Sequence, residues 1–586
     1  MKTKKRPSTI RSASWLPGGI LALVQNAGPK RRWPRPARTL TRAGLKLTLL
    51  CCHANAHKSI ALRFQKIAPW EDVVRDELAP LDAKSRADFL AFLTATTQRR
   101  CCREAAGNAL GKWLFETREV LRERMPLTGL SQDDPRALHI ELLIAADDRT
   151  FYVRGWFRDE ESTVERLTAV SPEGARVEIL NSVFRFDRPD IVTFYNMDRG
   201  EETGREFGFI RCFESPVPST FPEGWLFEME SKSGDAIEAR APRQIADPIR
   251  ARDAIFADLV LERPPKRELI SRHVHPAIRK LQKRRHAGIV AESVEQYGTP
   301  TTKPEASVIV PLYERIDFLE HQLAQFVHDA EFRAKADLIY VLDSPAQAEA
   351  LARNASRLAR LYDVPFRVVS LNRNGGFSTA NNIGIAHARC PRLLLLNSDV
   401  LPGHPGWLGR MAEFHEATPR IGALGAKLIF EDETLQHAGL YFSPMPDGSG
   451  WENLHFYKGL HRSLPAANIA RPVPAVTAAC LMIDRALYED IGGLRGMYVQ
   501  GDYEDSDLCL RLIERGLENW YLPGVELHHL EGQSYPAPLR ALTSRYNRWL
   551  HNHTWRGQIE SAMQRFGQLP SNARRASAKF TAAPRA

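Results

Sequence analysis

Four short apolar runs separated by helix-forming segments constrain the fold of this chain more than any other feature. The runs ASVIVPLY, LIYVLD, FRVVSL and RLLLLNSD read as buried strands, and segments such as AEALARNASRLARLY, with helical spacing of their apolar residues, lie between them. Strands this apolar are typical of a sheet that is covered on both faces. Repeated strand–helix units predict a doubly wound, mostly parallel α/β sheet, which we assign to residues 301–560.

Two of these strands end in acidic residues, Asp343 and Asp399. Ligands of open α/β sheets bind outside the carboxyl ends of the strands, so both carboxylates are expected at the same edge. Asn397 lies two residues before Asp399 and points to the same side of an extended segment. These positions predict a convergent polar site, although an Asp in such a place also commonly caps the following turn.

The segment SLNRNGGFSTANNIG leads from a strand into a helix. Gly375 and Gly376 would let the backbone approach a ligand, and amide groups at the start of the helix could bind an anion. The segment is neither a GxGxxG motif nor a Walker loop, so a tight turn is its simpler explanation.

A cluster of acids precedes a predicted helix in YVQGDYEDSDLCLRLIERG. Asp507 is predicted to be the N-cap of this helix. Glu504 and Asp505 are then placed in the preceding loop, where they could accept a proton or bind a metal ion, although acids at a helix start are also commonly structural.

Two neighbouring histidines, His528 and His529, close a strand-like segment farther on. Together with Asp399 and diphosphate oxygens, one of them could complete a metal site. Because side chains alternate along a strand, at most one of the two is expected to face that site.

The rest of the chain divides into further segments by composition and periodicity. Residues 57–128 have helical spacing, residues 134–247 alternate with a period of two and predict an antiparallel β-sandwich, and residues 248–300 form a basic helical linker. Residues 1–56 are predicted to be a basic disordered arm, and residues 561–586 a disordered tail.

The net charge of +10 belongs to the arm, because residues 1–50 hold twelve Lys and Arg and no acidic residue. Such an arm leaves a peripheral contact with the inner membrane open, but no nucleic-acid partner is expected. The apolar stretch WLPGGILALV is short and has no cleavage site, and no run is long enough to span a membrane, so a cytoplasmic location is expected. None of the eight cysteines forms a CxxC pair, which argues against a zinc framework.

Residues 305–535 resemble the family 2 glycosyltransferases, and especially their bacterial rhamnosyltransferase-like members that build surface polysaccharides. The motifs that carry the resemblance follow one another in the family's order: ASVIVPLYERIDFLEHQL, LIYVLDSP, NRNGGFSTANNIG, LLLLNSDV, VTAACLMIDRALYEDIGGL, EDSDLCLRL and HHLEGQS. The resemblance implies a GT-A fold that binds a nucleotide-diphospho-sugar and a divalent cation, Mg²⁺ or Mn²⁺.

The resemblance also implies roles for individual residues, carried over motif by motif. The nucleotide and donor positions are Pro311, Tyr313, Glu314, Asp343, Arg373, Asn382 and Asn397. The metal positions are Asp399, which ends the family's DXD motif, and His528 rather than His529. The catalytic base is Asp505, in an ED motif with Glu504. The chain departs from the family pattern at Asn397, where an Asp is usual, and on the acceptor side at Ala478 and near Arg495.

The chemistry of glycosyl transfer suits these residue types. A cation held by Asp399 would stabilise the departing diphosphate as a Lewis acid, and Asp505 would take the proton of the acceptor hydroxyl. A single displacement inverts the anomeric centre, and the acceptor is expected to be a saccharide or a lipid-linked sugar. Two alternatives stay open: a sugar nucleotidyltransferase, although VIVPLYERIDFL lacks its glycine-rich phosphate loop, and a catalytically silent protein that binds or assembles glycans.

Overall fold

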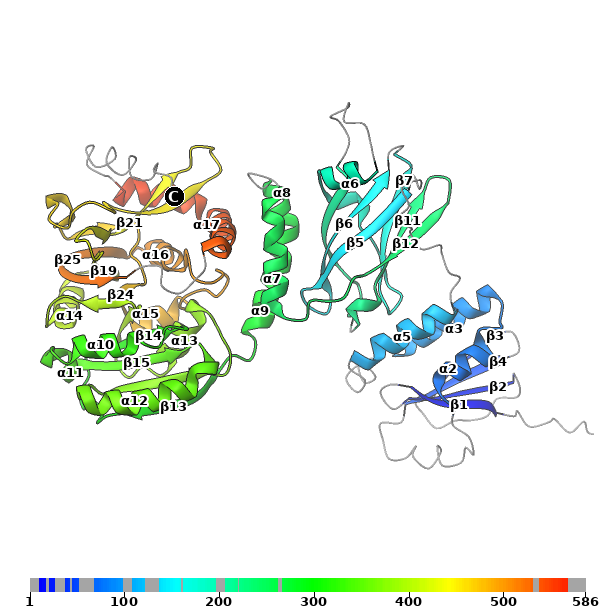
Figure 1. Ribbon diagram of the computed structural model, residues 1–586, viewed down its shortest axis with the longest axis horizontal. Coiled ribbons are helices and arrows are strands. Elements are labelled where there is room, and N and C mark those ends of the chain that lie inside the picture. Colours follow the sequence, from blue (N-terminus) through cyan, green and yellow to red (C-terminus); the bar gives the residue numbers. More distant parts are fainter. Residues whose placement is uncertain are drawn as a thin grey trace, which may run out of the picture. The chain divides into compact units, whose positions relative to one another are not determined.

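The computed structural model describes residues 10–16, 20–26, 37–42, 45–51, 68–97, 108–121, 136–159, 162–195, 206–219, 221–261, 266–530 and 537–567. The chain divides into two compact units, residues 1–284 and 285–586, and each is described by itself. Figure 1 shows their elements in sequence colours.

The first unit begins with a four-stranded antiparallel sheet, where a disordered arm was expected. Its strands are β1 (Ile10–Leu16), β2 (Ile20–Asn26), β3 (Ala37–Arg42) and β4 (Leu45–Cys51), in the order β1-β2-β4-β3. In β4 every residue from Leu45 to Leu50 is buried, and Leu45, Leu47 and Leu49 belong to the apolar core of this part of the chain. The expectation of disorder is therefore wrong for these strands, because it was based on the high charge of the whole segment and not on its short apolar runs.

Three helices share a core with this sheet. They are α2 (Trp70–Val73), which continues into a π-helical turn (Val74–Leu78), α3 (Ala83–Thr97) and α5 (Asn108–Leu121), and they lie within the helical range expected from the sequence. The indole rings of Trp70 and Trp113 pack 5.5 Å apart in this core, and Trp70 Nε1 donates to Thr117 Oγ1 over 2.9 Å. The buried indole nitrogen of Trp70 is thereby satisfied.

Two four-stranded antiparallel sheets follow. One has the order β5 (Arg136–Ala145), β6 (Thr150–Asp159), β10 (Gly208–Glu214) and β9 (Phe184–Phe186), and the other β12 (Ala236–Arg240), β11 (Leu226–Ser231), β7 (Val164–Val170) and β8 (Arg176–Glu178). Both contribute to one apolar core, in which Phe151 and Phe213 of the first sheet contact Trp225 beside the second. A smaller cluster around Trp156 and the helix α6 (Pro189–Phe194) is separate from this core.

The segment expected as a helical linker is only partly helical. It contains α7 (Pro248–Ala257), α8 (Arg267–Leu269) and α9 (His275–His286), and then the strand β13 (Ala291–Tyr297). β13 pairs antiparallel with β16 (Phe366–Leu371) and forms the outer edge of the large sheet of the second unit. Its side chains are mostly exposed, as in an edge strand with one polar side, and this hid its apolar signal in the sequence.

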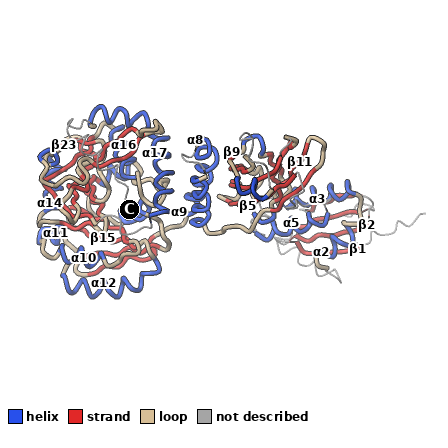
Figure 2. The backbone as a smooth tube through the Cα atoms, turned by 45° about the horizontal axis from the view of Figure 1, so that its top comes forward, coloured by secondary structure: helices blue, strands red, loops and turns tan. Residues whose placement is uncertain are grey.

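The second unit is built on an eleven-stranded sheet (Figure 2). Its first half is parallel: β16, β15 (Ala336–Leu342), β14 (Ala306–Leu312) and β17 (Arg392–Leu396) lie side by side in that order. Its second half is mixed: β24 (Cys480–Asp484) is antiparallel to β17 and to β19 (Ile421–Ile429), β19 is parallel to β25 (Glu518–His529), and β25 is antiparallel to β18 (Val400–Pro402). The sheet is therefore less uniformly parallel than the sequence predicted.

Helices cover both faces of this sheet, as expected for a doubly wound α/β unit. On one face α10 (Phe318–Phe326), α11 (Ala330–Lys335), α12 (Ala348–Tyr362) and α14 (Trp407–Ala417) share a core with alternate strand residues such as Val308 and Val310. On the other face α13 (Phe377–Ala386), α15 (Arg485–Asp490), α16 (Glu504–Glu514) and α17 (Ala537–Phe566) pack with the intervening residues, such as Ile309. Alternate side chains of each strand therefore pack into two separate cores, one on each face of the sheet.

A hairpin of β21 (Leu440–Pro444) and β22 (Trp451–His455) lies beside α17, and β20 (Leu435–His437) and β23 (Arg471–Val473) extend the sheet.

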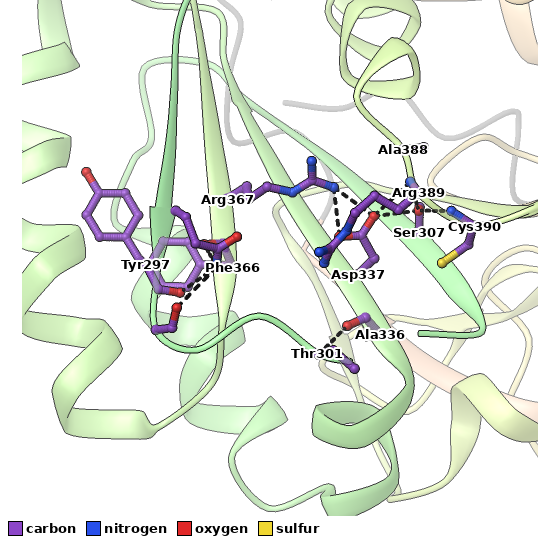
Figure 3. Close-up of polar contacts among 12 residues, drawn as sticks. Tyr297, Thr301, Ser307, Ala336, Asp337, Phe366, Arg367, Ala388, Arg389 and Cys390 are labelled. Atoms are coloured by element: carbon purple, nitrogen blue, oxygen red, sulfur yellow. Dashed lines mark hydrogen bonds and ion pairs between the residues drawn. The ribbon is translucent and has the colours of Figure 1, made fainter. Parts of the chain in front are cut away.

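The amino ends of the parallel strands are joined by a buried charge cluster (Figure 3). Asp337 accepts hydrogen bonds from Arg367 and Arg389 over 2.7 Å each, and from Ser307 Oγ over 2.7 Å. Burial alone would raise the pKa of Asp337. Its contacts with Arg389, Ser307 and Arg367 outweigh the effect of burial and hold the pKa below its ordinary value. These contacts join β14, β15 and β16 at the end of the sheet that lies opposite Asp343.

The last helix, α17, runs to Phe566 and so enters the range expected as a disordered tail. The remainder of that tail, beyond residue 567, lies outside the described residues. In the described part of the chain, every helix is too short or too polar to cross a membrane.

Candidate active site

Asp399 follows β17 in a turn that neighbouring elements hold in place. Gln322 of α10 is fully buried and donates from Nε2 to the backbone oxygens of Asn397, over 2.9 Å, and of Val400, over 3.0 Å. The amide of Leu530 donates to the backbone oxygen of Asp399 over 3.1 Å. The carboxylate of Asp399 is thereby fixed at the carboxyl end of the sheet, where ligands of such sheets bind.

The structure places His529, and not His528, beside Asp399. Nε2 of His529 lies 3.4 Å from Oδ1 of Asp399. In the antiparallel pair of β18 and β25, Val400 lies opposite His529 and Leu401 opposite His528. Since successive side chains of a strand point to opposite sides, His528 faces away from the carboxylate. The structure therefore favours His529 over His528, the histidine chosen from the sequence, as the partner of Asp399.

The atoms around Asp399 fit a divalent cation that also takes ligands from a substrate. Oδ1 of Asn397 is buried and has no hydrogen-bond partner among the described residues. Carboxylate and amide oxygens suit Mg²⁺ and Mn²⁺, and imidazole nitrogen suits many divalent metals. No group of three or more His, Cys, Asp or Glu in the described ranges could hold a metal by itself. Such a cation would therefore need ligands beyond Asp399 and His529.

Glu504 and Asp505 lie in the first turn of α16, because this helix begins at Glu504 rather than after Asp507. Asp505 accepts hydrogen bonds from the amides of Ser506, over 2.7 Å, and Ala478, over 3.4 Å. Burial raises the pKa of Asp505 to about 6. Burial, and then the charge of Asp505, raise the pKa of Glu504 further, to about 8. Asp505 is the more exposed of the two acids, so the penalty of burying a charge falls more heavily on Glu504.

Two adjacent alanines connect the acid pair with the turn of Asp399. The amide of Ala478 donates to Asp505, and the backbone oxygen of Ala479 accepts from the amide of Asn397 over 3.0 Å. Both alanines immediately precede β24, which pairs with β17. The sheet thus brings together Asp505 and the Asn397–Asp399 turn, although 106 residues of sequence separate the two aspartates.

Asp343 lies at the same edge of the sheet, but its carboxylate is occupied by the glycine loop. It accepts the amides of Gly375, over 2.5 Å, and Gly376, over 2.8 Å, and the side-chain amide of Asn374 over 2.9 Å. Arg285 donates to the side-chain oxygen of Asn374. Burial raises the pKa of Asp343 to about 6 against the effect of these donors. The amides that were expected to bind a ligand anion are therefore bound by Asp343.

The three residues expected to line a nucleotide pocket lie at or just after the end of β14. Pro311 pairs with Val341 in the parallel ladder. Burial and the neighbouring Glu314 raise the pKa of Tyr313 to about 12, so its hydroxyl is a neutral hydrogen-bonding group. Glu314 is exposed in a left-handed conformation, with φ 56°, and its amide donates to Ser344 Oγ over 2.9 Å. This segment lies beside Asp343, whose amide donates to the backbone oxygen of Leu312 over 2.9 Å, and its role at a nucleotide pocket stays a prediction.

Asn382 and Arg373, which the sequence places along the donor site, make hydrogen bonds to other parts of the chain. Asn382 donates to the backbone oxygen of Leu494 over 2.8 Å and accepts from the hydroxyl of Tyr488 over 2.5 Å, so its polar atoms hold the loop after α15. Arg373 is exposed and donates to the backbone oxygen of Ala287 over 2.6 Å. Motif matching could not show these contacts, because the partners lie 86 and more residues away.

Asp507 is a buried structural centre and not an N-cap. Its carboxylate accepts from Arg511 Nε over 2.9 Å, from Trp555 Nε1 over 2.7 Å, and at longer range from Tyr498 and Arg495. The side chain of Asp507 is fully buried. It therefore links α16 to α17 and to the loop that precedes α16.

Two residues that contact the site were not singled out from the sequence, Gln322 and Arg285. Gln322 lies three residues after Leu319, on the apolar side of α10, and a polar residue in a core position is a signal that could have found it. Arg285 precedes the first expected strand and lies in a run of basic residues. Nothing in the surrounding sequence distinguishes it from its basic neighbours.

Residues 307–492 match the model of the family described as Glycosyl transferase family 2. The chain is 29% identical over 232 residues to the uncharacterized protein y4gI of Sinorhizobium fredii, an alignment that covers 39% of this chain and 25% of that protein. It is 27% identical over 248 residues to the O-antigen biosynthesis protein RfbC of Myxococcus xanthus, covering 40% of this chain and 18% of RfbC. The chain thus spans a quarter or less of these relatives.

Two solved structures resemble parts of the chain. A structure of GalNAc-T7 with UDP, GalNAc and Mn²⁺ has a TM-score of 0.34 at 14% identity and covers 42% of this chain and 48% of its own. The mannosyltransferase PcManGT of Pyrobaculum calidifontis, in complex with GDP-Man and Mn²⁺, has a TM-score of 0.30 at 17% identity and covers 56% and 92%. At such TM-scores neither likeness supports a conclusion about this chain.

Proposed function

Because residues 307–492 are a family 2 glycosyltransferase domain, we propose that the chain transfers a sugar from a nucleotide-diphospho-sugar to a hydroxyl of a saccharide or lipid-linked acceptor, with inversion and on a GT-A fold. The observation that carries the proposal is the connection of Asp505, through Ala478 and Ala479, to the turn of Asn397 and Asp399. The likeness to an O-antigen biosynthesis protein supports a role in bacterial surface polysaccharide synthesis.

In this mechanism Asp505 acts as the general base. Its carboxylate takes the proton of the acceptor hydroxyl as that oxygen attacks the anomeric carbon, while the bond to the diphosphate breaks. The amides of Ser506 and Ala478 donate to its carboxylate and hold it in place. Burial raises the pKa of the neighbouring Glu504, which favours the protonated form of that more buried acid.

Asp399 and His529, with Asn397 beside them, would hold the divalent cation. When bound, that ion supplies Lewis-acid stabilisation of the departing diphosphate. Gln322 orients this turn from behind, and Pro311, Tyr313 and Glu314 would border the nucleotide near Asp343. In this scheme Asp343 holds the glycine loop and does not itself receive the nucleotide phosphates.

Activity should decline in acid because of Asp505. Its pKa is raised to about 6, so log(kcat/KM) is expected to fall with unit slope below about pH 6. The stability effect has the opposite sign: a carboxyl whose pKa is higher folded than unfolded makes folding more favourable as pH falls toward the unfolded value. The loss should therefore be reversible and not caused by unfolding of this group. A pH–rate profile with a parallel circular dichroism titration tests this, and activity that stays level to pH 4.5 would contradict it.

The two histidines give a second test within one strand. His529→Ala is expected to weaken Mn²⁺-dependent binding of a nucleoside diphosphate by about 10- to 100-fold, the range typical when a metal site loses a supporting group. His528→Ala should bind close to the wild-type level, because that side chain faces away from Asp399. Isothermal titration with and without Mn²⁺ measures both. Equal losses in the two variants would remove His529 from the proposed site.

The alternatives make different predictions for the same protein. A catalytically silent glycan-binding protein should show no metal-dependent binding of nucleoside diphosphate, and a nucleotidyltransferase should form nucleotide sugar from a sugar phosphate. The proposed transferase should hydrolyse one member of a panel of nucleotide sugars slowly, with a divalent cation and without acceptor. Absence of such hydrolysis across uridine, guanosine and thymidine diphosphate sugars, with Mn²⁺ and Mg²⁺, would overturn the proposal.

A further inference from the structure

The segment that carries Asp505 has an unusual backbone. We define the acid loop as residues 499–507, that is, the turn of residues 499–503 together with the first turn of α16. Within it Gln500 has a φ of 65°, Gly501 of 87° and Tyr503 of 78°, so three of four consecutive residues around Asp502 are left-handed, and two of them are not glycine. Non-glycine residues adopt this conformation only when surrounding contacts enforce it. The acid loop must therefore be held from outside.

One face of α17 supplies four of those contacts, and a further one comes from Asn453 of β22, whose Nδ2 donates to Ser506 Oγ over 2.7 Å. Ser544, Asn547, His551 and Trp555 are spaced by three or four residues, which places them on a single side of the helix. Each of the four contacts a different residue of the acid loop. The long helix therefore runs along the acid loop and touches it in four successive turns.

The four contacts are hydrogen bonds of ordinary length. Ser544 Oγ donates to Asp502 Oδ2 over 2.6 Å, and Trp555 Nε1 to Asp507 Oδ1 over 2.7 Å. His551 Nε2 and Ser506 Oγ lie 3.1 Å apart.

Asn547 makes the fourth contact with two bonds. Its Oδ1 accepts from the amide of Val499, and its Nδ2 donates to the backbone oxygen of Val499, both over 2.9 Å. Asn547 is fully buried.

Asn547 binds the acid loop where its unusual backbone begins. A pair of bonds to the amide and the carbonyl of one residue fixes the direction of the chain there, as a neighbouring strand would. The next residue, Gln500, is already left-handed. Without Asn547, the buried backbone groups of Val499 would lose both partners, and the loop could relax toward ordinary φ values.

We propose that Asn547 is a positioning residue for Asp505: by holding Val499 it keeps the acid loop in the strained conformation that presents the Asp505 carboxylate to the acceptor hydroxyl. This inference rests on the proposed transferase function. It assigns a part of the catalytic geometry to α17, which lies beyond the matched family domain of residues 307–492.

The same helix offers a matched control in Asn552. Its Oδ1 accepts from the amide of Trp451 over 2.6 Å, and its Nδ2 donates to the backbone oxygen of Trp451 over 2.7 Å. This is the same two-way bond to one residue, but the partner lies in the β21–β22 hairpin and not in the acid loop. A role of α17 in stability alone predicts similar effects for the two asparagines.

The experiment compares Asn547→Ala, Asn552→Ala and Ser544→Ala in the full chain. The readouts are kcat for metal-dependent hydrolysis of the nucleotide sugar that the wild type turns over, and the Kd of the nucleoside diphosphate with Mn²⁺. Asn547→Ala is expected to lower kcat by about 10²-fold, the cost typical of misplacing a reacting group by about an ångström, with Kd close to wild type. Asn552→Ala should lower the melting temperature while kcat stays close to wild type.

Ser544→Ala covers the case in which Asn547→Ala does not fold. It removes one hydrogen bond to Asp502 at a half-buried position, and should lower kcat in the same direction by a smaller factor, again with Kd unchanged. The inference is overturned if Asn547→Ala and Asn552→Ala have equal kcat, or, where the former does not fold, if Ser544→Ala keeps the wild-type kcat. An inactive wild type would instead overturn the proposed function, and this inference with it.

Discussion

Replacing Asp505 with Asn is expected to lower kcat by about 10² to 10⁴, the usual contribution of a general base. The amide has nearly the shape of the carboxylate, so its oxygen can still accept from Ser506 while the proton acceptor is lost. Binding of nucleoside diphosphate with Mn²⁺ should stay at the wild-type level, because the proposed cation ligands, Asp399 and His529, are not changed by this substitution. Single-turnover kinetics together with isothermal titration separate the two effects.

Glu504→Gln is the matched control for this prediction. Glu504 is the more buried acid of the pair, and burial raises its pKa, so glutamine resembles the neutral form that burial favours. Its effect on kcat should be much smaller than that of Asp505→Asn. The reverse order, with Glu504→Gln the slower variant, would assign the base to Glu504, and an unchanged rate in Asp505→Asn would remove Asp505 from the mechanism.

Asp507→Ala is expected to destabilise the unit of residues 285–586 by about 3–5 kcal/mol, the cost of leaving a buried charge without its partner. The guanidinium of Arg511, whose side chain is 7% exposed, would lose its carboxylate, and the indole nitrogen of Trp555 would lose its acceptor. Chemical denaturation followed by tryptophan fluorescence measures the change in unfolding free energy.

Asp490→Ala is a suitable comparison, because it removes an Asp–Arg pair that is exposed and not buried. Asp490 pairs with Arg515 at the surface, where the two side chains are 68% and 43% exposed. Exposed pairs of this kind contribute about 0–1 kcal/mol. If Asp507→Ala and Asp490→Ala unfold at the same denaturant concentration, Asp507 does not have the structural role assigned to it here.

The parts of the fold that could be predicted from sequence are those with local signals. The apolar runs located β14, β15, β16 and β17, and the residues that follow β15 and β17 mark the edge of the sheet where the site lies. The mixed second half could not be predicted, since the pairing of β24 with both β17 and β19 joins segments that are far apart along the chain. The strands of the first 51 residues were missed because the segment as a whole is strongly basic, and this outweighed short apolar runs such as that of β2.

The candidate site shows the same limit at the level of single residues. Alternation predicted that one histidine of the pair faces Asp399, but only the register between β18 and β25 selects His529. Likewise, the residue type of Asn382 suited a donor site, whereas its partners Tyr488 and Leu494 come from a distant loop. Long-range register and packing decide such cases, and a single sequence does not contain them.

The cluster of Asp337 with Arg367 and Arg389 has a consequence for redesign of this protein. The cluster joins the parallel strands at their amino ends, while the residues proposed for sugar transfer, such as Asp399, lie at the opposite end of the sheet. Loops at that opposite end can therefore be exchanged to alter sugar preference without touching the ion pairs that anchor the sheet. An engineer would leave the Asp337 end intact and diversify only the opposite rim.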